Sequence, residues 1–289
     1  MQLKHLFVSQ LATAACRAAV VEPHPPCGNP APSREYLQIL AKAKVAEVSV
    51  HASTNVKRVA RTVNTYLHII AADNTRAGGA IGQHVIDNQM NVLNSNFGST
   101  GYQFSLQGVD YTYDTLWSDI VLNRDLTNLK SSLRKGSYSD LNIYYFRSIS
   151  AKKGFRLTGY CSNPGNGSDN KTFYNDGCNL HVETMPGGSY WPWNEGKITS
   201  HEVGHWFGLI HPWGVNDAGG CSGVGDLVDD TPAQYSANYG CQVGYDSCPL
   251  LPGTDPIHNF MGYSDNSCVN EFTQGQITRM NYMFNKYRG

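Results

Sequence analysis

The sequence predicts an α+β protein: a twisted mixed sheet backed by helices, then a metal-binding helix, then an irregular disulfide-linked lower half that ends in a helix. Three observations support this fold class. Strand-like and helical stretches alternate over residues 62–207. Residues 201–211 read HEVGHWFGLIH, a helical start with three histidines. From there to an amphipathic stretch at 273–286 the chain shows no sustained hydrophobic period, and that segment holds four of the eight cysteines.

The overall composition argues against two classes of partner. A chain of 289 residues with 40% hydrophobic content can bury one large core or two subdomains. The formal net charge is −1 and the pI is near 6.8, so no broad basic surface indicates nucleic-acid binding. No stretch beyond the N-terminus approaches the roughly 18 apolar residues that span a bilayer. We expect a monomer with neither nucleic-acid nor membrane partners.

The N-terminus and the cysteines both indicate secretion. Residues 1–19 have a basic start, a moderately apolar core and small residues after it, which is typical of a signal peptide. The eight cysteines include no C-x-x-C pair, and six of them lie in loop-like sequence of the second half. This pattern predicts disulfides in an oxidising compartment. A second zinc site built from cysteines is the alternative.

Residues 20–61 differ in character from the rest of the chain. Prolines crowd the start of this segment, and a helix capped by Ser33 is predicted from there to about Val45. The basic cluster at 57–61, KRVAR, suits a processing protease. We expect a propeptide over 20–61; the alternative is an ordinary N-terminal extension.

The elements of the upper half follow in order. Strands are predicted at 62–70, 103–109 and 140–146 from their alternating β-rich sequence. Helices are predicted at 80–95 and 119–134, the second from leucines spaced 4, 3 and 4 residues apart. A last strand is expected at 180–185. Alternation of strand and helix indicates a helix-backed sheet.

The loop-rich stretch 154–188 carries two further predictions. Cys161 and Cys178 lie seventeen residues apart and most simply pair with each other. Asn166 and Asn170 each begin an N-x-S/T sequon, so both are expected to be glycosylated.

Residues 201–211 concentrate the chemistry of the chain. His201 and His205 lie four residues apart and therefore share one face of a helix starting at about 194 or 199, where two neutral imidazoles can bind Zn²⁺. Glu202 points away from the metal but can reach a water bound to it. His211 can join them only if the chain reverses, and Gly208 provides a residue that accepts the left-handed conformation.

This motif resembles that of the metzincin zinc endopeptidases. Asn259-Phe260-Met261-Gly262-Tyr263 is similar to their Met-turn, and the DLVDDTP stretch at 226–232 narrows the resemblance to the pappalysin family, in particular its small secreted fungal-type metalloproteases. The resemblance covers about residues 62–289. One local departure is the sequence after His211, which reads Pro-Trp.

The resemblance implies an architecture. The catalytic domain would span 62–289, with an upper subdomain at 62–208, a lower subdomain at 209–289 and the active-site helix above the cleft between them. The strand at 180–185 would be the edge strand that pairs with an extended substrate. The four later cysteines allow three pairings; the resemblance favours Cys221–Cys248 and Cys241–Cys268.

The implied activity is hydrolysis of peptide bonds in proteins. His201, His205 and His211 would bind one catalytic zinc, and a zinc-bound water would be activated by Glu202 as general base. Tyr263 would stabilise the oxyanion. Met261 would form an apolar floor beneath the ligands without binding the metal.

A cysteine in the expected propeptide extends the hypothesis. If Cys16 leaves with the signal peptide, seven cysteines remain and one must be unpaired. The thiolate of Cys27 is a suitable ligand for the open zinc position, and members of the family use such a cysteine switch. The propeptide would then be the enzyme's own inhibitor. Pairing with Cys16 and an incidental cysteine are the alternatives.

Three aspartates and two competing functions complete the predictions. Asp226, Asp229 and Asp230 could supply oxygen ligands to a structural Ca²⁺; solvated loop carboxylates and helix caps are the alternatives. The competing function from another class is a catalytically inactive, zinc-stabilised extracellular binding module. A gluzincin is the runner-up among enzymes, but it needs a glutamate about twenty residues after the helix, where only aspartates stand.

Overall fold

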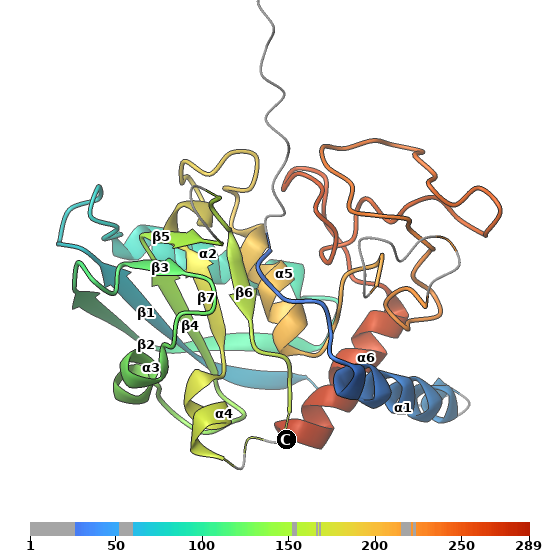
Figure 1. Cartoon of the computed structure of the whole chain (residues 1–289), viewed down its shortest axis with the longest axis horizontal. Coiled ribbons are helices and arrows are strands. Elements are labelled where there is room, and N and C mark those ends of the chain that lie inside the picture. Colours follow the sequence, from blue (N-terminus) through green and yellow to red (C-terminus); the bar gives the residue numbers. More distant parts are fainter. Residues whose placement is uncertain are drawn as a thin grey trace, which may run out of the picture.

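Figure 1 shows a computed structural model of the chain, which describes residues 27–51, 60–151, 155–165, 167, 169–214, 221 and 224–289. The expected signal peptide at 1–19, most of the basic cluster at 57–61 and the sequon residue Asn166 lie outside the described residues. Within that part of the chain, every helix is too short or too polar to cross a membrane.

The upper half is built on a five-stranded sheet. Its strands, in the order in which they neighbour one another, are β2 (Tyr102–Tyr113), β1 (Arg61–Ala71), β4 (Leu141–Phe146), β7 (Cys178–His181) and β6 (Gly159–Cys161). The first four run parallel, and β6 pairs antiparallel with β7. The short strands β3 (Asp119–Val121) and β5 (Ser148–Ser150) form a separate parallel pair. The mixed sheet predicted from the sequence is confirmed.

Helices enclose the sheet on both faces (Figure 1). The described helices are α1 (Arg34–His51), α2 (Gln83–Asn96), α3 (Thr127–Leu133), α4 (Asn170–Asn175), α5 (Lys197–Trp206) and α6 (Gln274–Tyr287). Of these, α1 packs on α6 rather than on the sheet. The main core joins one face of the sheet to α2, α5 and α6. In α2, Ile86, Met90 and Leu93 lie 4 and 3 residues apart, so they share the buried face. This core holds α5 rigidly against the sheet.

The expected helix at 119–134 is wrong in its first half. Residues 119–121 form β3, and Asn123 then adopts a left-handed φ of 69°, which no continuous helix allows. Asp125 accepts a hydrogen bond from the backbone of Thr127 (2.9 Å) where α3 begins. The leucines do pack in a core, because Leu126 and Leu129 are buried against the other face of the sheet.

The expected last strand is also corrected. Only its start is extended: β7 ends at His181 and residues 182–184 form a turn of 3₁₀-helix. The edge strand on this side is β6, which the sequence analysis left in a loop. Cys161 of β6 and Cys178 of β7 are register partners joined by a disulfide. The strand that borders the cleft is therefore 159–161.

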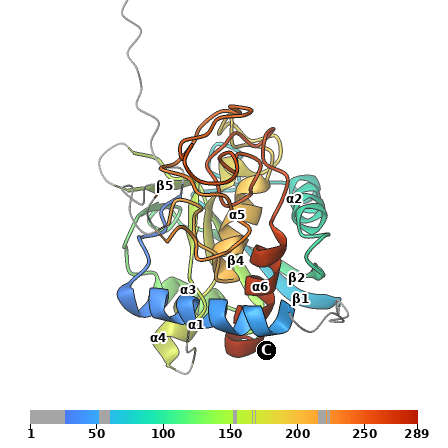
Figure 2. The same ribbon diagram turned by 90° about the vertical axis from the view of Figure 1, so that its right-hand side faces the viewer.

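The lower half has little regular structure. No helix or strand lies between 212 and 273 in the described part, and two disulfides, Cys221–Cys248 and Cys241–Cys268, link its loops. The closing helix α6 begins with a capping box in which Thr273 and Gln276 bond each other's backbone. Figure 2 shows α1 crossing α6 on the outside of this half.

The penultimate residue, Arg288, attaches the C-terminus to helix α5. Arg288 is 2% exposed and donates two hydrogen bonds to Asp176, at 2.8 and 2.9 Å. Its Nε donates to the carbonyl of Trp206, and its guanidinium lies 3.8 Å over the Trp206 ring. The indole of Trp206 donates in turn to Asp176 (3.1 Å). This buried network holds the C-terminal turn of α5.

We expect Arg288→Ala to lower the free energy of unfolding by about 3–5 kcal/mol, because it leaves a buried carboxylate with one charge partner fewer. Urea denaturation followed by tryptophan fluorescence measures the change. Lys286→Ala is the control, since Lys286 is exposed two residues earlier and its removal should cost less than about 1 kcal/mol. Equal effects of the two substitutions would contradict a structural role for the network.

Candidate metal centre

Helix α5 presents the first two histidines to one point. It begins after Gly196, whose left-handed φ of 80° turns the chain into the helix. All side chains from Ile198 to Trp206 are buried, so the helix runs through the molecule rather than over its surface. His201 and His205 lie one turn apart, and their Nε2 atoms are separated by 3.2 Å. This is the shared helical face that the four-residue spacing predicts.

A chain reversal at Gly208 brings the third histidine, His211, back to the other two. Gly208 has a φ of 94°, and the amide of Leu209 donates to the carbonyl of Gly204 (3.0 Å) to close the helix. A side chain at Gly208 would also collide with Met283, because a Cβ there would lie 2.8 Å from its Cγ. As a result, the Nε2 atom of His211 lies 3.2 Å from that of His205 and 3.3 Å from that of His201.

Hydrogen bonds and burial set the state of the imidazoles. His201 Nδ1 lies 2.7 Å from the carbonyl of Phe260, and His205 Nδ1 lies 2.9 Å from that of Leu209, so each Nδ1 donates and each Nε2 keeps its lone pair. Burial lowers the pKa of His201 to about 4 and that of His205 to about 3, and it lowers the pKa of His211 well below its usual value. All three are neutral at pH 7.

The residues fit a zinc ion. Three neutral lone pairs aimed at one point repel each other unless a cation lies between them. Nitrogens bound tetrahedrally at about 2.0–2.1 Å lie roughly 3.3–3.4 Å apart, close to the separations found here. The Sγ atom of Cys27 lies 3.5 Å from His205 Nε2, and the ligand atoms of all four residues lie within 4.8 Å of one another. A set of three nitrogens and one sulfur is typical of zinc.

Met261 lies directly against the ligand helix. It is fully buried, and a Cβ added at Gly204 would lie 2.4 Å from its Sδ atom, so only glycine leaves room for it. Its amide donates to the side chain of Asn259 (2.9 Å), and Asn259 forms a pair of hydrogen bonds with Gln276. The turn at 259–263 is thereby fixed between α5 and α6.

Glu202 is a buried carboxyl group beside this centre. It is 0% exposed, and among the described residues neither carboxyl oxygen has a hydrogen-bond partner. Burial raises its pKa to about 8, partly offset by an interaction with the Cys27 thiol. Burying a carboxyl group without a hydrogen-bond partner costs folding free energy, which indicates that another polar group binds it in the functional protein. Its stem packs close to β6, since a Cβ at Gly159 would lie 3.2 Å from its Cγ atom.

Two aromatic residues of the lower half border the ligands. The Tyr263 ring centre lies 5.0 Å from that of His211, and burial raises the pKa of the phenol well above its usual value. Trp213 stacks on His211 at 4.6 Å with an interplanar angle of 10° and meets Tyr263 edge-on. The sequence analysis missed Trp213 as a site residue; its position two residues after the third histidine was the available signal.

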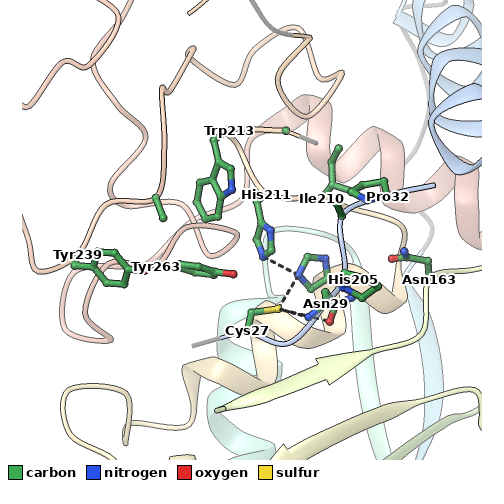
Figure 3. Close-up of a pocket in the computed structure, with 14 residues that line it drawn as sticks. Cys27, Asn29, Pro32, Asn163, His205, Ile210, His211, Trp213, Tyr239 and Tyr263 are labelled. Carbon is green, nitrogen blue, oxygen red and sulfur yellow. Dashed lines mark hydrogen bonds between the residues drawn. The ribbon is translucent and has the colours of Figure 1, made fainter. Parts of the chain in front are cut away.

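The N-terminal segment lies in the cleft, where it reaches the histidines (Figure 3). Cys27 is 5% exposed and is the free cysteine of the described residues. Burial, then the Glu202 charge, raises the pKa of its thiol. The amide of Gly28 donates to the carbonyl of Gly159 (2.7 Å), so this segment pairs with β6. A cavity of about 470 Å³ opens beside Cys27, bordered by Trp213 and the segment itself.

Asn29 adds a two-point contact that the sequence analysis did not predict. Its amide nitrogen donates to the carbonyl of Cys161 and its oxygen accepts from the amide of Cys161, both at 2.9 Å. The side chain thus bonds the edge strand as a backbone would. The backbone N–H of Asn29 also lies 3.4 Å from the Cys27 sulfur and donates toward it. These contacts orient Cys27.

The three aspartates expected to bind calcium engage separate partners. Asp226 accepts from the amide of Val228 (3.0 Å), and burial raises its pKa to about 7. Asp229 pairs with Lys44, and Asp230 accepts from the amide of Gly275 (2.8 Å). Among the described residues they do not form a group of three converging ligands. The sequon residue Asn170 is exposed at the start of α4.

Known proteins resemble this chain over nearly its whole length. Residues 189–285 match the peptidase family described as Pregnancy-associated plasma protein-A. An extracellular metalloprotease of Pyricularia oryzae is 43% identical over 286 residues, covering 98% of this chain and 96% of the relative. Another, from Sordaria macrospora, is 42% identical over 292 residues, covering 100% of this chain and 98% of the relative.

A solved structure shares the fold. Mature mirolysin of Tannerella forsythia in complex with a cleaved peptide has a TM-score of 0.63 at 26% identity, covering 80% of this chain and 93% of that chain. The α+β fold class expected from the sequence is thus confirmed, and the matched region 189–285 contains all three histidines. The chain therefore belongs to the Pregnancy-associated plasma protein-A family, the pappalysins, and is a metalloendopeptidase that acts on peptide substrates.

Proposed function

We propose that this protein is a secreted zinc endopeptidase, made as a zymogen, in which Glu202 is the general base and Cys27 blocks the metal until residues 20–61 are removed. The observation that carries the proposal is the convergence of three neutral Nε2 atoms at 3.2–3.3 Å beside a buried carboxyl group. Secretion is supported by the signal-like residues 1–19 and by the extracellular relatives.

The chain's own groups divide the work of hydrolysis. A zinc ion held by the three histidines would supply Lewis acidity that polarises the scissile carbonyl and makes a water nearby more acidic. Glu202 accepts the proton of the attacking water and delivers it to the leaving amine. The hydroxyl of Tyr263, which keeps its proton at neutral pH because burial raises its pKa, donates to the oxyanion. Met261 supports the ligand helix from below.

The edge of β6 is the proposed substrate platform. The carbonyl of Gly159 and both backbone groups of Cys161 already bind the N-terminal segment. An extended peptide can use the same groups once this segment has left, by adding a strand to the sheet. Residues 27–29 occupy the cleft and therefore block substrate binding at two places, the metal and the edge of the sheet.

Metal removal tests the proposed function. Dialysis of the processed enzyme against 1,10-phenanthroline should abolish casein cleavage, and one equivalent of Zn²⁺ should restore it. If protein shown by elemental analysis to be free of metal still cleaved casein, the assignment as a zinc endopeptidase would be contradicted. A metal-bound protein that cleaves nothing would instead support the binding-module alternative.

The predicted calcium is tested in the same experiment. Adding Ca²⁺ alone to the metal-free protein should leave cleavage at background and raise the melting temperature, because calcium bound near Asp226 stabilises the folded state by mass action. No shift at millimolar Ca²⁺ would remove this prediction and leave the zinc assignment untouched.

A further inference from the structure

We propose that the surface of α6 covered by α1 is a helix-docking site that persists after processing, and that its ligand is the released helix 34–51 of this same chain. This inference rests on the proposed function, because it takes residues 20–61 to be a removable propeptide. It adds a second binding surface, separate from the metal, through which the propeptide rebinds the mature enzyme.

The first support is an apolar stripe on α1. Tyr36, Leu40 and Ala43 lie 4 and 3 residues apart, so they share one helical face, and Leu40 and Ala43 are 0% exposed. This face packs on Ile210 and Met283. We call the surface beneath α1, which these two residues form together with Arg279, the groove. An amphipathic helix lying in a groove of this kind is a recurrent mode of peptide recognition.

The second support is a buried ion pair on the same face. Glu47 continues the stripe four residues after Ala43, and both of its carboxylate oxygens accept from Arg279, from Nη2 at 3.0 Å and from Nε. Arg279 is 0% exposed, and its Nη2 also donates to the carbonyl of Leu227 (2.8 Å). When α1 leaves, this guanidinium loses its carboxylate partner. The groove therefore selects an apolar helix that carries an acidic residue at the position of Glu47.

A third contact lies at the edge of the groove. Lys44 pairs with Asp229, but the two side chains are 39% and 69% exposed. Solvent screens such a pair, so it contributes little to the affinity. The selectivity of the groove comes from Arg279.

The groove and the metal centre bind two parts of the same ligand, the segment 27–51. Ile210 belongs to the groove and His211, the next residue, belongs to the metal centre. In the bound segment, Cys27 and Tyr36 are joined by eight intervening residues, so a helix seated on α6 keeps the cysteine close to the metal. Binding at one site raises the effective concentration at the other. The released propeptide is therefore a bipartite inhibitor that acts in trans.

Three synthetic peptides test this on enzyme processed from the full chain and freed of its propeptide by gel filtration. Residues 33–51 contain the helix without Cys27, residues 27–32 contain the cysteine without the helix, and residues 27–51 contain both. We expect 33–51 to bind in fluorescence anisotropy without inhibiting peptide hydrolysis. We expect 27–51 to inhibit at about 10²-fold or more lower concentration than 27–32.

Two variant peptides with the same charge change locate the contact. Glu47→Gln should weaken binding of 33–51 by at least about 30-fold, because it leaves Arg279 without a buried counter-charge. Glu35→Gln is the matched control: Glu35 is exposed on the same helix, and its substitution should change the affinity less than about 2-fold. The enzyme is unchanged throughout, so no result can be ascribed to misfolding.

The outcomes separate this inference from the proposed function. Failure of 33–51 to bind, or equal affinity of the two variant peptides, overturns the docking site even if processing activates the enzyme. Binding of 33–51 to a processed protein that has no proteolytic activity supports the docking site and overturns the proposed function instead.

Discussion

Replacing Glu202 by Gln is expected to lower kcat/KM for a peptide substrate by roughly 10²–10⁴-fold, the usual contribution of a positioned general base. The substitution keeps the shape of the side chain and removes its ability to take a proton. Because Glu202 lies beside the three histidines without being one of the converging ligands, zinc content should remain at one per chain. The decisive pair of measurements is therefore peptide hydrolysis and elemental analysis on the same sample.

Glu195→Gln is the matched control. Glu195 lies just before α5, its side chain is half exposed, and it pairs loosely with Lys197 at 3.7 Å. The same change of charge at this position should alter kcat/KM less than about 2-fold. A Glu202→Gln protein as active as this control would remove Glu202 from the mechanism, and loss of zinc would reassign it to the metal site.

The clustering of the three histidines was predictable from the sequence because its geometry is local. Spacing along a helix fixes the relative directions of His201 and His205, and the left-handed preference of glycine fixes where the chain can turn back toward His211. Met261 had to be taken from resemblance, since a methionine in an apolar turn has no distinguishing periodicity. Its contact with Gly204 depends on tertiary packing alone.

Strand β6, which borders the cleft, was not predicted, for a different reason. Residues 159–161 are too few to show alternation, and they become a strand only through their pairing with β7 and the Cys161–Cys178 disulfide. The role of Asn29 depends in turn on that edge strand, because its side chain bonds the backbone of Cys161. Non-local pairing of this kind leaves no periodic signal at either partner.

The leucines at 122–133 show how a correct packing assignment can accompany a wrong element. Their spacing matched a helix, yet Asn123 turns the chain, and a turn followed by a short helix brings the same leucines to the same core. Hydrophobic spacing reports which side chains are buried more directly than it reports the backbone that carries them.

Replacing Cys27 by Ala is expected to give an unprocessed protein that already hydrolyses a small peptide substrate, whereas the wild-type zymogen stays at background. Without the sulfur, the segment in the cleft keeps the hydrogen bond from the Gly28 amide to the Gly159 carbonyl and the two hydrogen bonds between the Asn29 side chain and the backbone of Cys161. Each contributes only about 0.5–1.5 kcal/mol net in competition with water, and a substrate offers the same edge strand equivalent bonds. The segment is then displaceable.

Asn29→Ala provides the graded comparison for that experiment. It removes two bonds to β6 and retains the thiol 3.5 Å from His205 Nε2, so the unprocessed protein should remain latent or show only a small fraction of the Cys27→Ala activity. Adding Glu202→Gln to Cys27→Ala should abolish the gained activity, which excludes a contaminating protease. A silent, zinc-loaded Cys27→Ala zymogen that processing then activates would show that steric cover by residues 28–51, rather than the sulfur, enforces latency.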